Sequence, residues 1–309
     1  MKTIAFNAQV DSLIEDYRAH LLNAAGLTLS TCKCWTFYAR EFLRAQFKPR
    51  GAGLDCLTLN AQSLLDYFRK QSQSCGPPRL QAMGCALRSL CRFLCLSGRH
   101  PEDLSAAVPR IADRGREDLP AYLSVEELER LLRGVDPSTL AGKREGAVLL
   151  SLARLGLRAG EAAQLTLDDL HWETGTLRLA QTKGRRERCL PLPHDVGQAI
   201  ARYLRQRPHS ADSRRVFLTL RGGRPLSARA VSALSVAALK RAGLTRVRPG
   251  AHLLRRTVAS HLVQQGASLK AVADWLGHRS LNTTQIYAKV NLPMLRSVAV
   301  PWPSSEVPS

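Results

Sequence analysis

The stretch AHLLRRTVASHLVQQGASLKAVADWLGHRSLNTTQIYAKV, residues 251–290, contains the side chains around which the chain is organised. His252 and Arg255 are three residues apart at the start of an amphipathic segment, so a helix there places both side chains on one face. A second amphipathic segment spans residues 268–276 and ends at Gly277, because a glycine after an apolar periodic segment is a typical helix stop. The pattern therefore predicts two helices with polar side chains at their ends.

Two further polar side chains follow that glycine. His278 comes directly after it, and Tyr287 lies nine residues past His278. Asn282 lies between them and is of the residue type that caps a helix start, which predicts a third short helix carrying Tyr287. Two imidazoles, a guanidinium and a phenol gathered at one place suit an anionic phosphate and a phenolic nucleophile.

Two basic residues upstream are candidates for the same site. Arg158 follows Gly156, where a buried helix predicted over residues 138–155 ends, and Glu161 lies three residues further on. Taken alone, this is an ordinary Arg–Glu salt bridge, since exposed pairs are common and individually weak. Lys183 lies in a turn between two predicted strands, where a lysine is usually just solvated. Neither residue indicates a function by itself.

In their order along the chain, these motifs resemble the tyrosine recombinases of the phage integrase family. The resembling pieces are H-L-L-R at residues 252–255, L-G-H-R-S at residues 276–280 and Tyr287, preceded by Arg158 and then Lys183. Each piece alone is weak, whereas five pieces in one order are specific. The resemblance covers residues 119 to about 290, and the N-terminal third only in general character.

The resemblance implies one set of catalytic residues around a single DNA phosphate: Arg158, Lys183, His252, Arg255, His278 and Tyr287. Tyr287 would attack phosphorus and form a 3′-phosphotyrosyl link, which another 5′ hydroxyl can reverse without ATP. The two arginines would hold the growing charge and the two histidines would donate hydrogen bonds, with His252 suited to proton transfer. Lys183 would protonate the departing 5′ oxygen, and Glu161 would orient Arg158. Neither a cofactor nor a metal is expected.

The sequence also leaves alternatives. A type IB topoisomerase-like relaxase shares this chemistry, and a DNA-binding accessory protein with a decayed active site belongs to another class. Taken singly, each residue has a plain structural interpretation, such as a half-buried tyrosine whose hydroxyl finds a partner. One departure from the family stands at Arg256, where many members have histidine; it leaves Arg255 in place and concerns a secondary contact.

The charge of the chain agrees with a polyanionic partner. The 309 residues carry a formal net charge of +20, which suits DNA or RNA, while a solvated basic surface is the plain alternative. An anionic membrane surface is less favoured, because no basic amphipathic segment stands apart from a core. No apolar run approaches the ~18 residues of a membrane span, and the N-terminus lacks the apolar core of a signal peptide. We therefore expect a cytoplasmic, nucleoid-associated protein.

The cysteines are concentrated in the N-terminal third. Seven of the eight lie between Cys32 and Cys95, and their spacings are not those of paired zinc knuckles. Without a secretion signal, they are expected to be reduced and mostly buried small residues.

Apolar periodicity predicts four helices in the same third, over residues 9–24, 28–45, 60–73 and 77–96. Short connections between them predict a compact bundle, of the SAM-like core-binding type that the resemblance implies. In the family this bundle clamps the duplex opposite the catalytic domain. Candidate DNA contacts, there and near the catalytic motifs, are Lys33, Arg40, Arg44, Arg69, Lys70, Arg88, Arg92, Arg185, Arg186 and Arg256.

Composition divides the chain into a domain of residues 1–108, a proline-containing linker of 109–118, a catalytic domain of 119–291 and a tail of 292–309. Ser124 with Glu127 forms a capping box that opens the catalytic domain. Alternating leucines on either side of Lys183 predict antiparallel strands, and helices are expected over 194–205 and 227–242. The predicted fold is mainly α with a small antiparallel β-sheet (α+β). By resemblance, four protomers assemble on paired sites of double-stranded DNA, and the tail docks on a neighbour.

Overall fold

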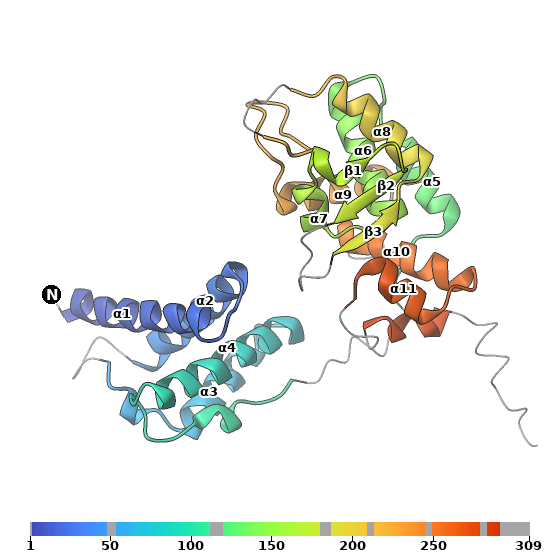
Figure 1. The fold of residues 1–309 in the computed structure, drawn as a ribbon. Helices are drawn as coiled ribbons and strands as arrows, with labels where there is room; N and C mark the ends of the chain where they lie inside the picture. The colour runs from blue at the N-terminus through green and yellow to red at the C-terminus, as the bar shows by residue number, and fades with distance from the viewer. Residues whose placement is uncertain are drawn as a thin grey trace, which may run out of the picture. The chain divides into compact units, whose positions relative to one another are not determined.

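The computed structural model describes residues 2–47, 54–111, 120–179, 187–208, 213–244, 249–278 and 283–290. The chain divides into two units, residues 1–115 and 116–309 (Figure 1). This division falls within the segment 109–118 that composition indicates as a linker. The predicted tail of residues 292–309 lies outside the described residues.

The first unit is a bundle of four α-helices with two short 3-10 helices. Its elements are α1 (Lys2–Asn23), α2 (Leu29–Gln46), η1 (Cys56–Thr58), α3 (Ala61–Ser72), α4 (Pro77–Leu96) and η2 (Leu104–Ala107). Helix α1 begins at Lys2 rather than at residue 9, and Phe6 on its first turns is buried in the core. The caps agree with the sequence, since Thr28 and Asn60 accept hydrogen bonds from the first turns of α2 and α3.

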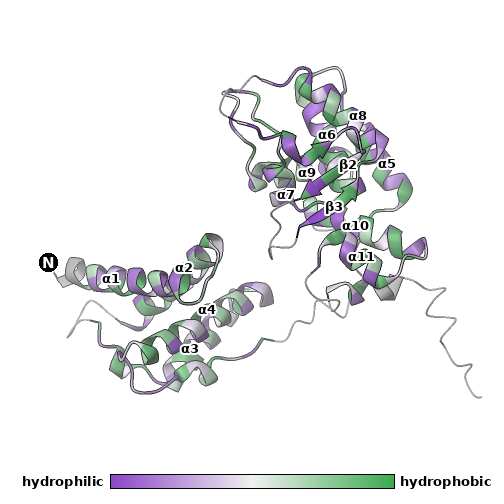
Figure 2. Ribbon diagram, in the orientation of Figure 1, coloured by the Kyte–Doolittle hydropathy of each residue, from purple (hydrophilic) through white to green (hydrophobic). Residues whose placement is uncertain are grey.

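Apolar side chains from all four helices form the core of this unit. Hydrophobic and hydrophilic residues alternate along α1 and α4 (Figure 2), as expected for helices with one face in a core. Tyr17 of α1 is fully buried, and its hydroxyl donates a hydrogen bond to the Ala86 carbonyl of α4 at 3.1 Å. This long-range bond satisfies a buried polar group and ties the first helix to the last.

The cysteines are free, but the prediction that they are mostly buried is wrong. Of the eight, only Cys32, Cys56 and Cys91 are buried. Cys34 lies two residues after Cys32 on the same helix, and a two-residue step moves a side chain to another face, where Cys34 is exposed. The pattern of apolar neighbours decides burial here, and the residue type does not.

The second unit combines seven α-helices of the described residues with one small sheet. The helices are α5 (Val125–Arg133), α6 (Leu140–Leu155), α7 (Ala159–Gln164), α8 (His194–Leu204), α9 (Ala228–Arg241), α10 (Ala251–Gln264) and α11 (Leu269–Leu276), with 3-10 helices η4 (Leu167–Asp169) and η6 (Gln285–Val290). The capping box that opens α5 is confirmed, because Ser124 Oγ accepts from the Glu127 amide and Glu127 reaches back to the Ser124 amide.

Helix α6 is the buried helix that the sequence predicts. It packs against α8 and α10, and Leu149, Leu152 and Leu155 are completely buried. It ends at Gly156, whose φ of 65° is the left-handed conformation that favours glycine. A Cβ at this position would lie 2.7 Å from a methyl carbon of Leu276, so the glycine also allows α11 to approach closely. The chain after α6 is thereby held against the end of α11.

The sheet has three antiparallel strands in the order β1 (Leu170–His171), β2 (Thr176–Leu179) and β3 (Arg188–Pro191). Leu177 pairs with Leu190, and Leu179 pairs with Arg188 at the end where residues 180–187 connect β2 to β3. The inward-facing Leu177, Leu179 and Leu190 are buried, which confirms the alternation.

The segment after α6 is helical, since α7 begins at Ala159. The short helix predicted to carry Tyr287 is the 3-10 helix η6, and its expected cap Asn282 lies outside the described residues. Residues 216–219 form an extended connection with an isolated bridge between Leu218 and Pro225. The fold class is confirmed as mainly helical with a small antiparallel sheet. No helix in the described ranges has the length and apolar character to span a membrane.

Two glycines of α6 provide a test of this packing. At Gly142 an added Cβ would lie 1.6 Å from the Asp136 carbonyl oxygen, whereas at Gly146 it would lie 3.7 Å from a Val135 methyl group. Gly142→Ala should therefore lower the free energy of unfolding by about 1–3 kcal/mol. Gly146→Ala should raise it by about 0.5–1 kcal/mol, because alanine is the better helix former. Urea unfolding followed by circular dichroism measures both; changes of the same sign would contradict the packing described.

Candidate active site

Five of the six predicted catalytic residues lie in described parts of the second unit. Arg158 directly precedes α7, His252 and Arg255 lie in the first turns of α10, His278 follows α11, and Tyr287 lies in η6. Helix α10 packs against α11 and η6, and Figure 1 shows α10 and α11 side by side. The sixth residue, Lys183, lies outside the described residues, as do Arg185 and Arg186.

The carboxylate of Glu161 organises the arginines of the site. It is 6% exposed, and its Oε1 accepts a hydrogen bond from Arg158 Nη1 at 2.5 Å. Its Oε2 accepts from the Arg158 backbone amide at 2.9 Å and from Arg188 Nη2 at 2.7 Å. Arg255 Nη1 lies 3.8 Å from the same oxygen. Three guanidinium groups against one carboxylate leave an excess of two positive charges, an arrangement that suits an anion.

The guanidinium groups are also held by carbonyls at the ends of helices. Arg255, which is 2% exposed, donates to the Gly156 carbonyl at 2.6 Å and to the Leu276 carbonyl. Arg158 Nη2 donates to the Gly277 carbonyl at 3.2 Å. The last carbonyls of a helix lack partners within the helix and carry partial negative charge, so they suit cations. Burial and the charge of Arg158 lower the pKa of Arg255 to about 9, which leaves Arg255 charged at neutral pH.

His278 is held as a neutral imidazole. Its Nδ1 lies 2.7 Å from Oγ1 of Thr284, a fully buried residue just before η6. Burial, followed by the charges of Arg255 and Arg158, lowers the pKa of His278 to about 4. When Thr284 donates this bond, the ring hydrogen is on Nε2, which is then available as a donor to a ligand.

His252 lies on the first turn of α10 and is exposed. Even so, surrounding protein atoms lower its pKa, and the charges of Arg256 and Arg255 act in the same direction. The imidazole is therefore neutral at physiological pH and can accept a proton.

Tyr287 is 3% exposed and packs in a cluster with Val258, Val272 and Leu276. Burial raises the pKa of its phenol, while the charges of Arg256 and Arg255 lower it. Tyr287 thus lies within electrostatic range of Arg255 and of the half-buried Arg256. The phenol is neutral in the unliganded protein, and its deprotonation calls for a base.

The DNA-contact candidates of the first unit differ in their surroundings. Arg40 Nε forms an ion pair with Asp11 at 3.1 Å, and Arg88 Nη1 donates to the carbonyls of Val108 and Pro109 at 3.4 and 3.1 Å. The remaining candidates are exposed on the helices: Lys33, Arg44, Arg69, Lys70 and Arg92. Arg44 and Arg69 form ion pairs with Asp11 at 3.9 Å and with Asp66 at 3.1 Å. Arg88 therefore secures the segment that follows α4, whereas Lys33, Lys70 and Arg92 extend into solvent.

The structure adds two residues to the site that sequence reasoning missed, Arg188 and Thr284. Arg188 is in the run RRERCLPL, where charged residues are frequent and nothing marks one as buried. Thr284 lies in SLNTTQIY, where it resembles an ordinary loop threonine. Their roles depend on contacts with Glu161 and His278 that are distant or irregular in sequence, so no periodic pattern indicates them.

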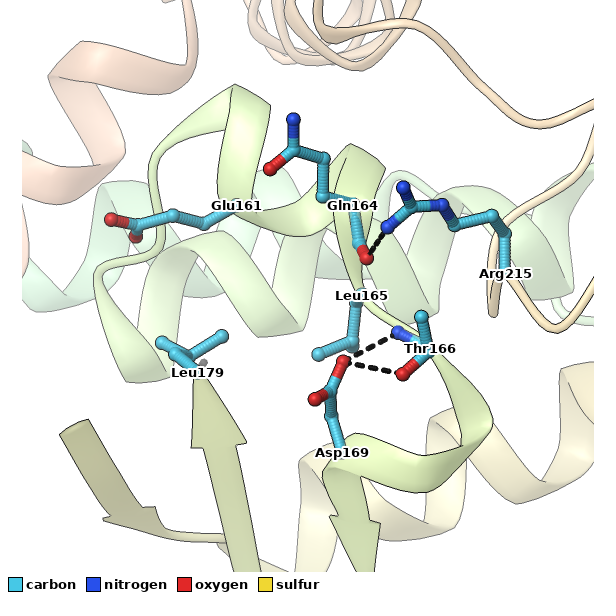
Figure 3. A pocket seen from close by; sticks show the side chains of 7 residues that line it. All are labelled: Glu161, Gln164, Leu165, Thr166, Asp169, Leu179 and Arg215. Atoms are coloured by element: carbon cyan, nitrogen blue, oxygen red, sulfur yellow. Dashed lines mark hydrogen bonds between the residues drawn. The ribbon is translucent and has the colours of Figure 1, made fainter. Parts of the chain in front are cut away.

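A cavity of about 300 Å³ lies beside the cluster (Figure 3). Glu161 is at one side of it and Arg215 at the other, with Leu179, the last residue of β2, between α7 and the sheet. Asp169 accepts hydrogen bonds from the Thr166 amide and hydroxyl at 2.8 and 2.7 Å. The arginines that bond to Glu161 are not among the lining residues, so this cavity is separate from the arginine cluster.

The sequence pattern of the phage integrase family matches residues 121–292. The chain belongs to this family. Protein y4rA of Sinorhizobium fredii is 38% identical over 300 residues, which cover 95% of this chain and 71% of y4rA. The tyrosine recombinase XerA of Thermococcus kodakarensis is 30% identical over 94% of each chain. XerD of Listeria monocytogenes is 30% identical over 94% of this chain and 97% of XerD.

Solved structures of the family share the fold. The XerH recombinase in a post-cleavage complex with its difH substrate has a TM-score of 0.71 at 21% identity, over 90% of this chain and 82% of that chain. A lambda integrase dimer on a core site has a TM-score of 0.69 at 17% identity, over 90% and 94%. Family membership and the recombinase relatives make the chain a tyrosine recombinase, an enzyme that cuts and rejoins DNA. This confirms the enzyme class predicted from the sequence.

The neutral state of His278 gives a pH dependence of stability. Its pKa falls from 6.5 to about 4 on folding, so between these values the unfolded chain binds the proton more strongly. Stability from this group is complete above pH 6.5 and is lost as the pH falls towards 4, by roughly 1–2 kcal/mol because solvent screens the partly exposed ring. In His278→Gln, the urea midpoints of unfolding at pH 4 and at pH 6.5 should differ less than they do in the wild-type protein. The matched variant His171→Gln, at an exposed position of β1, should keep the wild-type pH dependence; identical profiles for all three proteins would refute this.

Proposed function

We propose that the chain is a site-specific recombinase of double-stranded DNA in which Tyr287 is the nucleophile. The observation that carries this proposal is the Glu161 cluster, where Arg158 and Arg255 share one carboxylate and leave an excess of positive charge. His278 and Tyr287 lie at its edge, within range of the same charges. A phosphate balances that excess and meets donors in a water-poor setting, where they act strongly.

In the proposed reaction, the phenol oxygen of Tyr287 forms a bond to phosphorus while the bond from phosphorus to the 5′ oxygen breaks. Neutral His252 accepts the phenol proton, and Lys183 gives a proton to the leaving oxygen. The two arginines and Nε2–H of His278 donate to the non-bridging oxygens, whose charge grows in the transition state. A 5′ hydroxyl of another strand then reverses the step, so neither ATP nor a metal is required.

The proposed partner is duplex DNA, bound by four protomers on two sites. A lambda integrase of the same fold forms a tetramer on a Holliday junction, and XerH binds the difH site. The net charge of +20 and the exposed basic residues of the first unit support contact with phosphates. Relaxation by a topoisomerase-like relaxase and binding by an accessory protein are less favoured, because XerA and XerD, each 30% identical to this chain, are tyrosine recombinases. We further propose that the enzyme acts in the cytoplasm on the nucleoid.

Tyr287→Phe should bind DNA as the wild-type protein does and form no covalent protein–DNA adduct, because only the nucleophilic oxygen is removed. A labelled substrate with a nick that traps the adduct, analysed on denaturing gels, measures the covalent product. The control is Tyr122→Phe, which removes a hydroxyl that accepts from Gln264 at 2.9 Å outside the cluster. Adduct should form with this control and in the presence of EDTA. An adduct with Tyr287→Phe would refute the nucleophile, and loss with EDTA would refute metal-free cleavage.

Arg158→Ala should slow adduct formation by roughly 10²–10³-fold, the scale for losing one preorganised charge stabiliser. Single-turnover rates at saturating DNA separate this effect from weaker binding. Arg154→Ala is the matched control. Arg154 lies on α6, its side chain is 43% exposed, and it forms an ion pair with Asp195 at 2.9 Å. A wild-type rate for Arg158→Ala, or an equal loss in the control, would contradict the proposed phosphate contact.

A further inference from the structure

Arg188 is a buried cation to which the reaction above gives no task. It is the first residue of β3, and its side chain is 8% exposed. Burying a guanidinium is costly unless it is well paired. Burial accordingly lowers the pKa of Arg188, and the neighbouring charge of Arg158 acts in the same direction. The contacts of Arg188 must therefore compensate the free-energy cost of burying its charge.

Three elements meet at this one side chain. Arg188 Nη2 donates to Glu161 Oε2 at 2.7 Å, and Nη1 donates to the Trp275 carbonyl in the last turn of α11 at 2.7 Å. Nη1 is so close to Gly277 that a Cβ there would lie 3.1 Å from it. In the strand ladder, Arg188 pairs with Leu179, where the segment containing Lys183 leaves the sheet. The side chain thus joins β3, α7 and the end of α11 that precedes His278.

Neutralising Glu161 does not require Arg188, because Arg158 already binds both the carboxylate and the carbonyl of Gly277. The contribution of Arg188 is geometric: it occupies Oε2, so that Oε1 faces Arg158 Nη1. Among the described residues its Nε has no hydrogen-bond partner, so the site accepts an unsatisfied buried donor to place the two Nη groups. The fork of Arg188 therefore sets the separation between Glu161 and α11.

We propose that Arg188 is a positioning residue for strand cleavage, which holds Glu161 and the end of α11 so that Arg158 and His278 face the same phosphate. It acts through these residues and makes no contact with DNA. This proposal rests on the function proposed above. It also places Arg188 at the end of β3 that pairs with Leu179, so that one fork links β3 to Glu161 and to the end of α11.

Arg188→Met tests this, since methionine fills the buried space without donors. Single-turnover adduct formation at saturating DNA should slow on the order of 10-fold to 10²-fold, the scale for misplacing reacting groups. DNA affinity should change less than twofold. Arg154→Met, an exposed arginine of the same unit, is the control with an unchanged rate. Circular dichroism and thermal unfolding verify that both variants are folded. A folded Arg188→Met with a wild-type rate overturns the proposal.

A double-mutant cycle with Glu161→Gln separates positioning from a general loss of stability. If Arg188 acts through Glu161, the double variant should cleave no more slowly than the slower single variant. Rates that multiply overturn the proposal. A second readout is the His278 imidazole, whose NMR pKa should rise from about 4 in Arg188→Met because a neighbouring charge is removed. An unchanged His278 pKa would also count against it.

Arg188→Lys covers the case in which the methionine variant does not fold. Lysine keeps the charge but cannot span Glu161 and the Trp275 carbonyl with a rigid fork. It should slow cleavage about tenfold, on the same scale of misplacement. A wild-type rate for Arg188→Lys overturns the proposal. Failure of the proposed function is a distinct result, because then Tyr287→Phe would still form the adduct or the wild-type protein would form none.

Discussion

The ion pairs of Glu161 are the interaction on which the site depends. One carboxylate at 6% exposure accepts from Arg158 and Arg188 and lies 3.8 Å from Arg255. Without it, three guanidinium groups would repel one another in a setting where charges are poorly screened. With it, the three arginines can be buried together, and the cluster still has a net positive charge. Folding and the proposed phosphate binding therefore make opposite demands on the same residues, and a single carboxylate satisfies both.

The ends of two helices supply the remaining support. Carbonyls of Gly156, Leu276 and Gly277 accept from Arg255 or Arg158, which compensates part of the cost of burying these cations. Both helices stop at glycines with positive φ, so the chain can turn sharply where the arginines need partners. The site is thus built from backbone groups that any helix end would leave unpaired, and this explains why arginines, with several donors in a plane, are used.

Local spacing made much of this predictable. His252 and Arg255 lie on one helical face, and Gly277 stops α11 directly before His278, because such features depend on neighbours in sequence. Arg188 and Thr284 were not predictable, since their partners are set by packing between β3, α7, α11 and the segment around η6. For the same reason the sequence predicted burial for cysteines that are exposed. Local sequence spacing predicts which side chains share a helix face, while tertiary packing decides which side chains of different elements are in contact.

The protonation states complete the physical picture. Burial and then the positive field of the cluster lower the pKa of His252 and of His278, so both imidazoles are neutral. The same field lowers the pKa of the Tyr287 phenol against the effect of burial. A bound phosphate offsets that field, so it raises the pKa of both imidazoles. It also raises the pKa of the phenol, because it cancels part of the lowering by the arginines. In the proposed reaction, the phenol of Tyr287 therefore needs a base once the phosphate is bound. His252 is the base that we propose, because it is neutral before binding and a bound phosphate makes it more basic.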